Sequence, residues 1–257
     1  MVLGFKSRVC AKYEVRQYFI PMEHGVLPGE VKPNAGYGAP ATDKARAKTY
    51  FHGTNTPEKA NSIWKSGIKP DLSKSETYDR PVAGRVYITE NLSYAIIYAL
   101  GGDFAGQECK SLIDRHGRFA FVFKIDGKQL DKIFPDEDQV GEAVHVHFKN
   151  TKKFPWMSKY EDLLQEEEPL EHGHFRNLLE EVRNGDYAAW IVAGHLLLPE
   201  LTDAQKYEIM EHFGNVAHEG MLKPYEMWMF DREKCKELKK YGSNFFELAT
   251  LKEKRGK

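Results

Sequence analysis

The stretch Thr49-Tyr50-Phe51-His52-Gly53-Thr54 has the aromatic and β-branched residues of a short strand, and it ends at a His-Gly-Thr corner. A helix is predicted directly after it, because Thr56 can cap the first turn, Pro57 suits the first helical position and Gly67 can end the run. Its apolar face recurs at helical spacing, at Ala60, Ile63 and Trp64. His52 is therefore expected at a strand end, on a corner held by a helix, where functional side chains are commonly found.

The composition is that of a globular protein without strong charge. The chain of 257 residues carries 37 Lys and Arg against 38 Asp and Glu, a net charge of −1, which predicts no whole-molecule electrostatic binding to nucleic acid or to an anionic membrane. No apolar run reaches the ~18 residues of a membrane helix, and residues 1–20 lack the apolar centre of a secretory signal. Cys10, Cys109 and Cys235 are few and far apart, which favours a reducing compartment. We expect a cytoplasmic protein with no membrane partner, although a secreted effector without a cleaved signal would have the same composition.

The rest of the chain mixes strands and helices, which predicts an α+β fold. Further strands are expected at 84–89, 119–125 and 221–231, and a short helix at 90–100. Four more helices are expected, at 159–168, 174–183, 187–198 and 202–213. Pro224 marks the start or the edge position of the last strand.

Three parts of the chain can be distinguished. Residues 1–48 form an N-terminal extension with a Pro- and Gly-rich segment at 21–42, which either packs on the domain as a solvated extension or covers a pocket or touches a target. Residues 49–257 form the main domain, and residues of about 150–215 are predicted to be a helical insertion within it. The acidic residues of the 161–171 segment are expected on a solvated helix face.

Candidate site residues lie on three separate predicted strands and one helix. His52 ends the first strand, Tyr87 lies on the second, and Tyr98 follows eleven residues later on the predicted helix. Glu226 lies on the last strand, on the same face as Trp228 and Phe230. An unpaired buried carboxylate is costly, so Glu226 is expected either to have a partner or to face a cleft.

These residues resemble the motifs of the ADP-ribosyltransferase superfamily, in the His-Tyr-Glu branch shared by the diphtheria-type toxins and the poly(ADP-ribose) polymerases. The resemblance covers three short islands between positions 50 and 231: Phe51-His52-Gly53-Thr54, then 84–89 leading to Tyr98, and Tyr225-Glu226-Met227-Trp228-Met229-Phe230-Asp231. One departure is that Ala95 stands where the polymerases have a serine, so one contact to the nicotinamide carboxamide is missing or comes from elsewhere.

The resemblance implies a split two-sheet β-sandwich with small helices, and a role for each motif residue. His52 would bind the adenosine ribose of NAD, the backbone of Gly53 the nicotinamide carboxamide, and Thr54 a ribose hydroxyl. Tyr87 and Tyr98 would enclose the nicotinamide ring. By this resemblance, the residues that bind NAD would be His52, Gly53, Thr54, Tyr87 and Tyr98, and the catalytic residues would be Glu226, His52 and Tyr87.

Breaking the nicotinamide–ribose bond develops positive charge on the sugar, which a fixed carboxylate such as Glu226 would stabilise. The implied activity is a glycosyltransferase reaction of the pentosyltransferase class, transferring a single ADP-ribose from NAD to a macromolecular acceptor, with protein favoured over nucleic acid. By analogy such a chain would suit a toxin, an effector or a defence protein. An NAD glycohydrolase, a non-catalytic NAD- or ADP-ribose-binding module and a nucleic-acid modifier remain alternatives.

Two alternative site readings also follow from the sequence. Glu219, close before the last strand, rivals Glu226 for the catalytic position. The pairs His145-x-His147 and His172-x-His174 resemble partial metal sites, but no third and fourth ligands occur at convincing spacing, so no metal is expected and NAD is the expected co-substrate.

Overall fold

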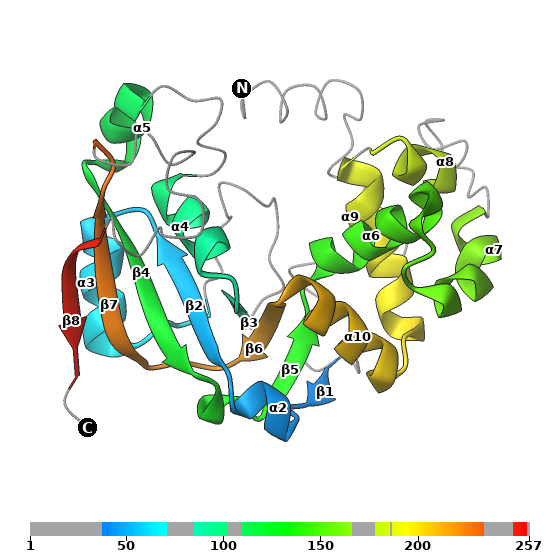
Figure 1. Cartoon of the computed structure of the whole chain (residues 1–257), viewed down its shortest axis with the longest axis horizontal. Coiled ribbons are helices and arrows are strands. Elements are labelled where there is room, and N and C mark those ends of the chain that lie inside the picture. Colours follow the sequence, from blue (N-terminus) through cyan, green and yellow to red (C-terminus); the bar gives the residue numbers. More distant parts are fainter. Residues whose placement is uncertain are drawn as a thin grey trace.

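The fold combines one open β-sheet with a separate group of helices (Figure 1). The computed structural model describes residues 38–70, 85–101, 109–165, 178–185, 187–233 and 249–255. The predicted α+β class is confirmed. The predictions for residues 1–37, for position 84 and for the His172-x-His174 pair lie outside the described residues.

The sheet contains eight described strands, and every neighbouring pair is antiparallel. Their order across the sheet is β1-β5-β6-β3-β2-β4-β7-β8. The four strands predicted from sequence correspond to β2, β3, β4 and β7, which lie next to one another in the sheet. The strands are β1 (Ala39–Pro40), β2 (Thr49–Thr54), β3 (Arg85–Thr89), β4 (Phe119–Asp126), β5 (Lys132–Pro135), β6 (Asn215–Glu219), β7 (Pro224–Asp231) and β8 (Ala249–Lys254).

A seam divides this sheet between β2 and β3. Strand β2 pairs with β4 along all six of its residues, but with β3 through the single register pair Phe51–Thr89. The two halves are consequently inclined to each other, with β8, β7, β4 and β2 on one side and β3, β6, β5 and β1 on the other (Figure 1). In place of two separate sheets, the described strands therefore form one continuous sheet with a weakly paired seam.

Two helices cover opposite faces of the β2–β4–β7 half. Helix α3 (Pro57–Ser66) packs on one face, where the strands contribute Phe121, Phe123 and Met227. Helix α4 (Leu92–Leu100) packs on the other face, against Val122 and Trp228. The alternation of faces along each strand follows the period of two in a pleated strand. We call these the α3 face and the α4 face.

The ends of these helices follow their local sequence. Thr56 accepts a hydrogen bond from the Lys59 N–H at 3.3 Å, so it caps α3 as predicted. Helix α4 is capped by the side chain of Asn91 and ends at Gly101, whose φ of 112° lies in the region that favours glycine. The strand–helix units on which the predicted site depends are thus confirmed.

The helical part begins earlier than the predicted boundary near residue 150, because α6 already starts at Glu137, directly after β5. It ends with α10, which matches the helix predicted at 202–213 and is bounded by a Thr202–Gln205 capping box and by Gly214. The elements are α6 (Glu137–Val146), the π-helical turn η5 (His147–Thr151), the 3-10 turns η6 (Pro155–Tyr160) and η7 (Leu198–Glu200), α7 (Glu161–Gln165), α8 (Leu178–Arg183), α9 (Tyr187–Leu197) and α10 (Asp203–Phe213).

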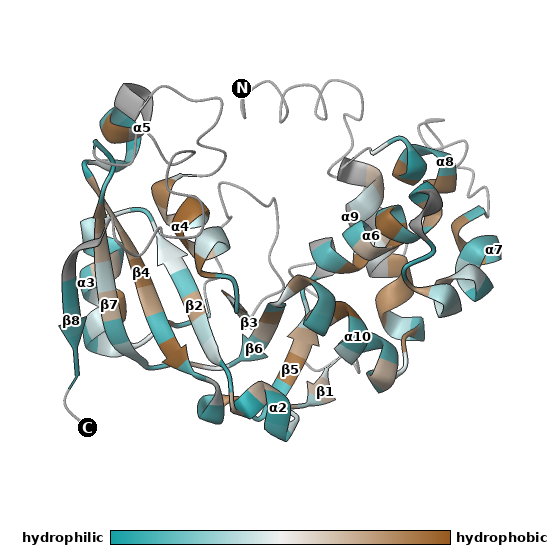
Figure 2. Cartoon of the chain, in the orientation of Figure 1, coloured by the Kyte–Doolittle hydropathy of each residue, from teal (hydrophilic) through white to brown (hydrophobic). Residues whose placement is uncertain are grey.

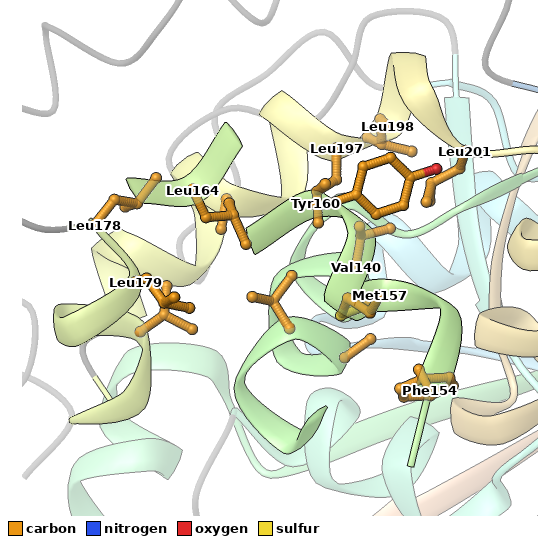
Figure 3. Close-up of a cluster of buried hydrophobic side chains, with 14 of the residues drawn as sticks. Val140, Phe154, Met157, Tyr160, Leu164, Leu178, Leu179, Leu197, Leu198 and Leu201 are labelled. Carbon is orange, nitrogen blue, oxygen red and sulfur yellow. The ribbon is translucent and has the colours of Figure 1, made fainter. Parts of the chain in front are cut away.

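These helices have a hydrophobic core of their own. Leucine side chains from α7, α8, α9 and η7 converge with Phe154 and with Met157 and Tyr160 of η6 (Figure 3). Residues such as Leu164, Leu179 and Leu197 are fully or almost fully buried there. This cluster is separate from the cores on the two faces of the sheet, so the helical part folds around its own apolar centre.

Smaller elements complete the described chain. They are α2 (Asp43–Arg46), α5 (Cys109–His116) and the 3-10 turn η4 (Gly127–Gln129). The C-terminal end adds β8 to the sheet as an edge strand, and its coloured residues are hydrophilic whereas β4 carries strongly hydrophobic positions (Figure 2). Among the described helices, none is long and apolar enough to cross a membrane.

Candidate functional site

The His52 side chain lies at the seam between β2 and β3. It is the first residue after the Phe51–Thr89 pair, and its Nδ1–H donates to the carbonyl oxygen of Tyr87 at 2.9 Å. This bond fixes the neutral tautomer, with the lone pair on Nε2, and Nε2 makes no hydrogen bond within the described parts of the chain. Desolvation lowers the His52 pKa and the Lys59 charge lowers it further, while the bond to Tyr87 opposes them. At neutral pH the ring therefore offers a hydrogen-bond acceptor.

Gly53 allows helix α4 to touch β2 directly. A Cβ at this position would lie 2.2 Å from the carbonyl oxygen of Ala95 and 2.9 Å from the backbone nitrogen of Ala99. No side chain other than hydrogen fits there without moving backbone atoms of α4. The absence of a side chain at Gly53 thus brings α4, which carries Tyr98, onto the strand at the seam.

The two predicted tyrosines come to this region from different elements. Continuing the Phe51–Thr89 register by two residues places Tyr87 across the seam from Gly53, and Tyr87 is half-buried. Tyr98 is half-buried on α4 next to Ala99, and its ring centroid lies 6.0 Å from that of Tyr94. The structure therefore places Gly53, Tyr87 and the helix that bears Tyr98 on the α4 side of the seam, while His52 contacts the Tyr87 carbonyl from the α3 side.

Two other residues define the borders of this region. Thr54 is buried and pairs with Phe121, which places its side chain on the α3 face, away from helix α4.

Tyr94 has a raised pKa, chiefly because of burial and then because of the charges of Glu142 and Asp136. The tyrosine-bearing helix α4 thus approaches the carboxylates at the start of the helical part.

The structure does not bring Glu226 together with His52, which corrects the predicted placement. Glu226 pairs with Lys124, and Lys124 pairs with Phe51, so their side chains share the α4 face. His52 pairs with Phe123 and projects to the α3 side. Two strand spacings, roughly 10 Å, also separate β7 from β2. The imidazole and this carboxylate therefore do not line one crevice.

Glu226 is instead enclosed by its own partners. It is 5% exposed, and its Oε1 accepts a hydrogen bond from Trp228 Nε1 at 2.5 Å. Lys124 Nζ lies 3.4 Å and Lys254 Nζ 3.8 Å from Oε2. Burial raises the Glu226 pKa, but the Trp228 hydrogen bond and the two lysines outweigh it, so the pKa lies below its ordinary value. The expected partner of this buried charge is therefore present, and it is structural.

Strand β6 was missed by the sequence analysis, and it is the strand that lies next to Tyr87. Tyr87 pairs with Ala217, while Glu219 pairs with Arg85 and Asn215 with Thr89. Because paired residues share a face, Asn215, Ala217 and Glu219 lie on the same face as Tyr87. Glu219, the alternative carboxylate, is half-buried and stands two residues from the Tyr87 pair. The local sequence gave no signal for Asn215, because it lies between the helix predicted at 202–213 and the strand predicted at 221–231.

The pair His145-x-His147 does not form a metal site in the described chain. His145 Nδ1–H donates to the Val182 carbonyl at 2.6 Å, while His147 Nε2 and the Ser158 hydroxyl are 3.0 Å apart. The two rings thus serve separate contacts. Within the described residues, no group of three or more His, Cys, Asp or Glu side chains could hold a metal ion.

Comparisons of the chain with protein-family models, with curated proteins and with solved structures found no match.

Proposed function

We propose that this chain has an ADP-ribosyltransferase-like split fold, that it binds NAD at the β2–β3 seam, and that it transfers ADP-ribose from NAD to a macromolecular acceptor. The observation that carries the proposal is the geometry of the seam. There the His52 ring is hydrogen-bonded across the two strands to the Tyr87 carbonyl, and Gly53 contacts the backbone of α4. Two strands that pair at one position leave backbone groups of β2 available to a ligand. The motif resemblance involves the same residues.

Each residue at the seam has chemistry that suits one part of NAD. The backbone N–H and C=O of Gly53, beside the weakly paired seam, suit the nicotinamide carboxamide. Tyr87 and Tyr98 offer flat faces to the nicotinamide ring. The neutral His52 ring, with Nε2 as an acceptor, suits a hydroxyl of the adenosine ribose.

The reaction also needs a carboxylate near the ribose that loses nicotinamide. We assign this role to Glu219 rather than Glu226, because Glu219 lies on β6, directly beside the strand of Tyr87, whereas Glu226 lies three strands from β3 and is enclosed by Trp228 and two lysines. In the reaction, the bond from the ribose carbon to the nicotinamide nitrogen breaks with its electron pair leaving on nicotinamide. An acceptor nucleophile then bonds to that carbon and gives up its proton. A carboxylate stabilises the positive charge that develops on the sugar between these events.

Incubation of the full chain with labelled NAD and candidate protein and nucleic-acid acceptors tests the proposal. Label on protein or on nucleic acid supports a transferase and identifies the acceptor class. Release of free ADP-ribose alone would replace it with an NAD glycohydrolase. Binding of NAD without turnover would replace it with a binding module, and absence of binding would refute the site.

The two carboxylates provide a matched pair of variants for the same assay. Glu219→Gln should lower turnover ~10²- to 10³-fold while leaving NAD affinity nearly unchanged, because only stabilisation of the transition state is lost. Glu226→Gln should leave turnover near the wild-type value. The reverse pattern would assign the catalytic role to Glu226. Wild-type turnover in both variants would show that neither carboxylate takes part in the reaction.

A further inference from the structure

Asn215 carries a buried acceptor that the protein itself does not use. It is the first residue of β6 and is 7% exposed. Within the described parts of the chain, its Oδ1 has no hydrogen-bond partner. Most buried polar side-chain atoms in proteins are hydrogen-bonded, and each exception calls for an explanation, such as a ligand.

The position of Asn215 is well defined by its neighbours. Asn215 pairs with Thr89, and the N–H of Glu90 donates to the carbonyl oxygen of Gly214 at 2.7 Å, which fixes the end of the pairing. Gly214 has a φ of 74°, so the turn that leads from α10 into β6 depends on glycine. The backbone around Asn215 is therefore held from both sides.

This position lies beside the proposed nicotinamide site. Tyr87 pairs with Ala217, so Asn215 stands diagonally from Tyr87 on the same face. Side chains in this diagonal relation are typically ~7–8 Å apart at their α-carbons, which allows one ligand to touch both. The side chains of Asn215 and Tyr87 thus lie on the same face of the sheet.

We infer that Asn215 recognises a ribose hydroxyl of the nicotinamide half of the bound nucleotide, an inference that rests on the proposed function. The nicotinamide ring and carboxamide are already provided for by Tyr87, Tyr98 and Gly53. The remaining donors in that half of the ligand are the ribose hydroxyls. An amide oxygen accepts an O–H without carrying a charge, so Asn215 positions the sugar, while the electrostatic role stays with the carboxylate.

The variant Asn215→Leu separates ligand recognition from a structural role. It is similar in size and leaves no unsatisfied acceptor, so the ligand-free protein should melt at or above the wild-type temperature. Affinity for NAD and for nicotinamide mononucleotide, measured by calorimetry on the full chain, should fall about three- to tenfold. Affinity for nicotinamide alone should not change, because it has no ribose.

Asn184→Leu is the matched control, because Asn184 is an exposed asparagine directly after α8. It should change neither the melting temperature nor the affinity for NAD. Equal NAD affinity in wild type and Asn215→Leu would refute the role of Asn215 while leaving the proposed function intact. A clear drop in melting temperature with unchanged affinity would assign Asn215 to the fold. Absence of NAD binding in the wild-type protein would overturn the proposed function and this inference together.

Discussion

Replacement of Arg232 should show that one buried guanidinium holds together the ends of several elements. Arg232 is fully buried just after β7. It donates to the carbonyl oxygens of Ala99 and Leu100 at the end of α4, at 2.8 and 3.1 Å. It also donates to Gly117 and Phe119 at 2.7 Å each, to Asn55 at 2.9 Å, and more weakly to His116 at 3.4 Å.

The expected size of the effect follows from these contacts. Five of the six distances are 3.1 Å or shorter, which matches the five N–H groups of a guanidinium. A lysine at position 232 has three donors and no planar fork, so at least two buried carbonyls lose their partner. Each unsatisfied buried acceptor costs ~1–3 kcal/mol, which gives a loss of ~2–6 kcal/mol for Arg232→Lys.

Urea unfolding of the full chain, followed by circular dichroism, measures this loss. A change of that size is a large share of the ~5–15 kcal/mol by which domains are usually stable. Arg183→Lys is the control, because Arg183 forms an exposed ion pair with Glu161 and should change stability by less than ~0.5 kcal/mol. If Arg232→Lys cost less than ~1 kcal/mol, the carbonyl contacts would not be the source of stability argued here.

Three further changes test the seam and its surroundings. Gly53→Ala should lower the free energy of unfolding by ~1–3 kcal/mol, because its Cβ would lie 2.2 Å from the Ala95 carbonyl oxygen; an unchanged urea midpoint would show that α4 moves without cost. Glu226→Leu should lower it by ~1–3 kcal/mol, because Trp228 Nε1 loses its buried acceptor; stability equal to that of wild type would contradict this. His52 has a lowered pKa, chiefly through burial. The unfolded chain therefore binds more protons once the pH falls below ~6.5, and stability should fall with pH until the folded pKa is passed. His52→Asn should reduce that fall in urea unfolding between about pH 7.5 and about pH 5, and an unchanged slope would assign it to other groups.

The central strands could be predicted because their patterns are strong and local. Strand β4 is a short apolar run rich in phenylalanine, and β2 is followed at once by a capped helix. Strands β5 and β6 were missed because they are four and five residues long and lie next to helices, so no period is visible. Their pairing depends on partners distant in the chain, which a local pattern does not contain.

The candidate site was predictable in part for the same reason. The shared face of Glu226, Trp228 and Phe230 is confirmed, because alternation along a strand is a local property. The distance of Glu226 from His52 depends instead on the order of strands, in which β4 lies between β2 and β7. Sheet order comes from tertiary packing, and the motif spacing carried no information about it.

Strands β5 and β6 are neighbours in the sheet, yet the whole helical part, 137–213, lies between them in the chain. Pro135 pairs with Val216, so the polypeptide leaves and re-enters the sheet at nearly the same point. A two- to five-residue hairpin turn could connect the same two strands, since they are antiparallel. Closing so long a loop costs more conformational entropy than closing a hairpin, which slows it. We therefore expect β5 and β6 to pair only after the helices between them have formed. The same geometry would let evolution lengthen, exchange or delete the helices while the seam keeps its shape.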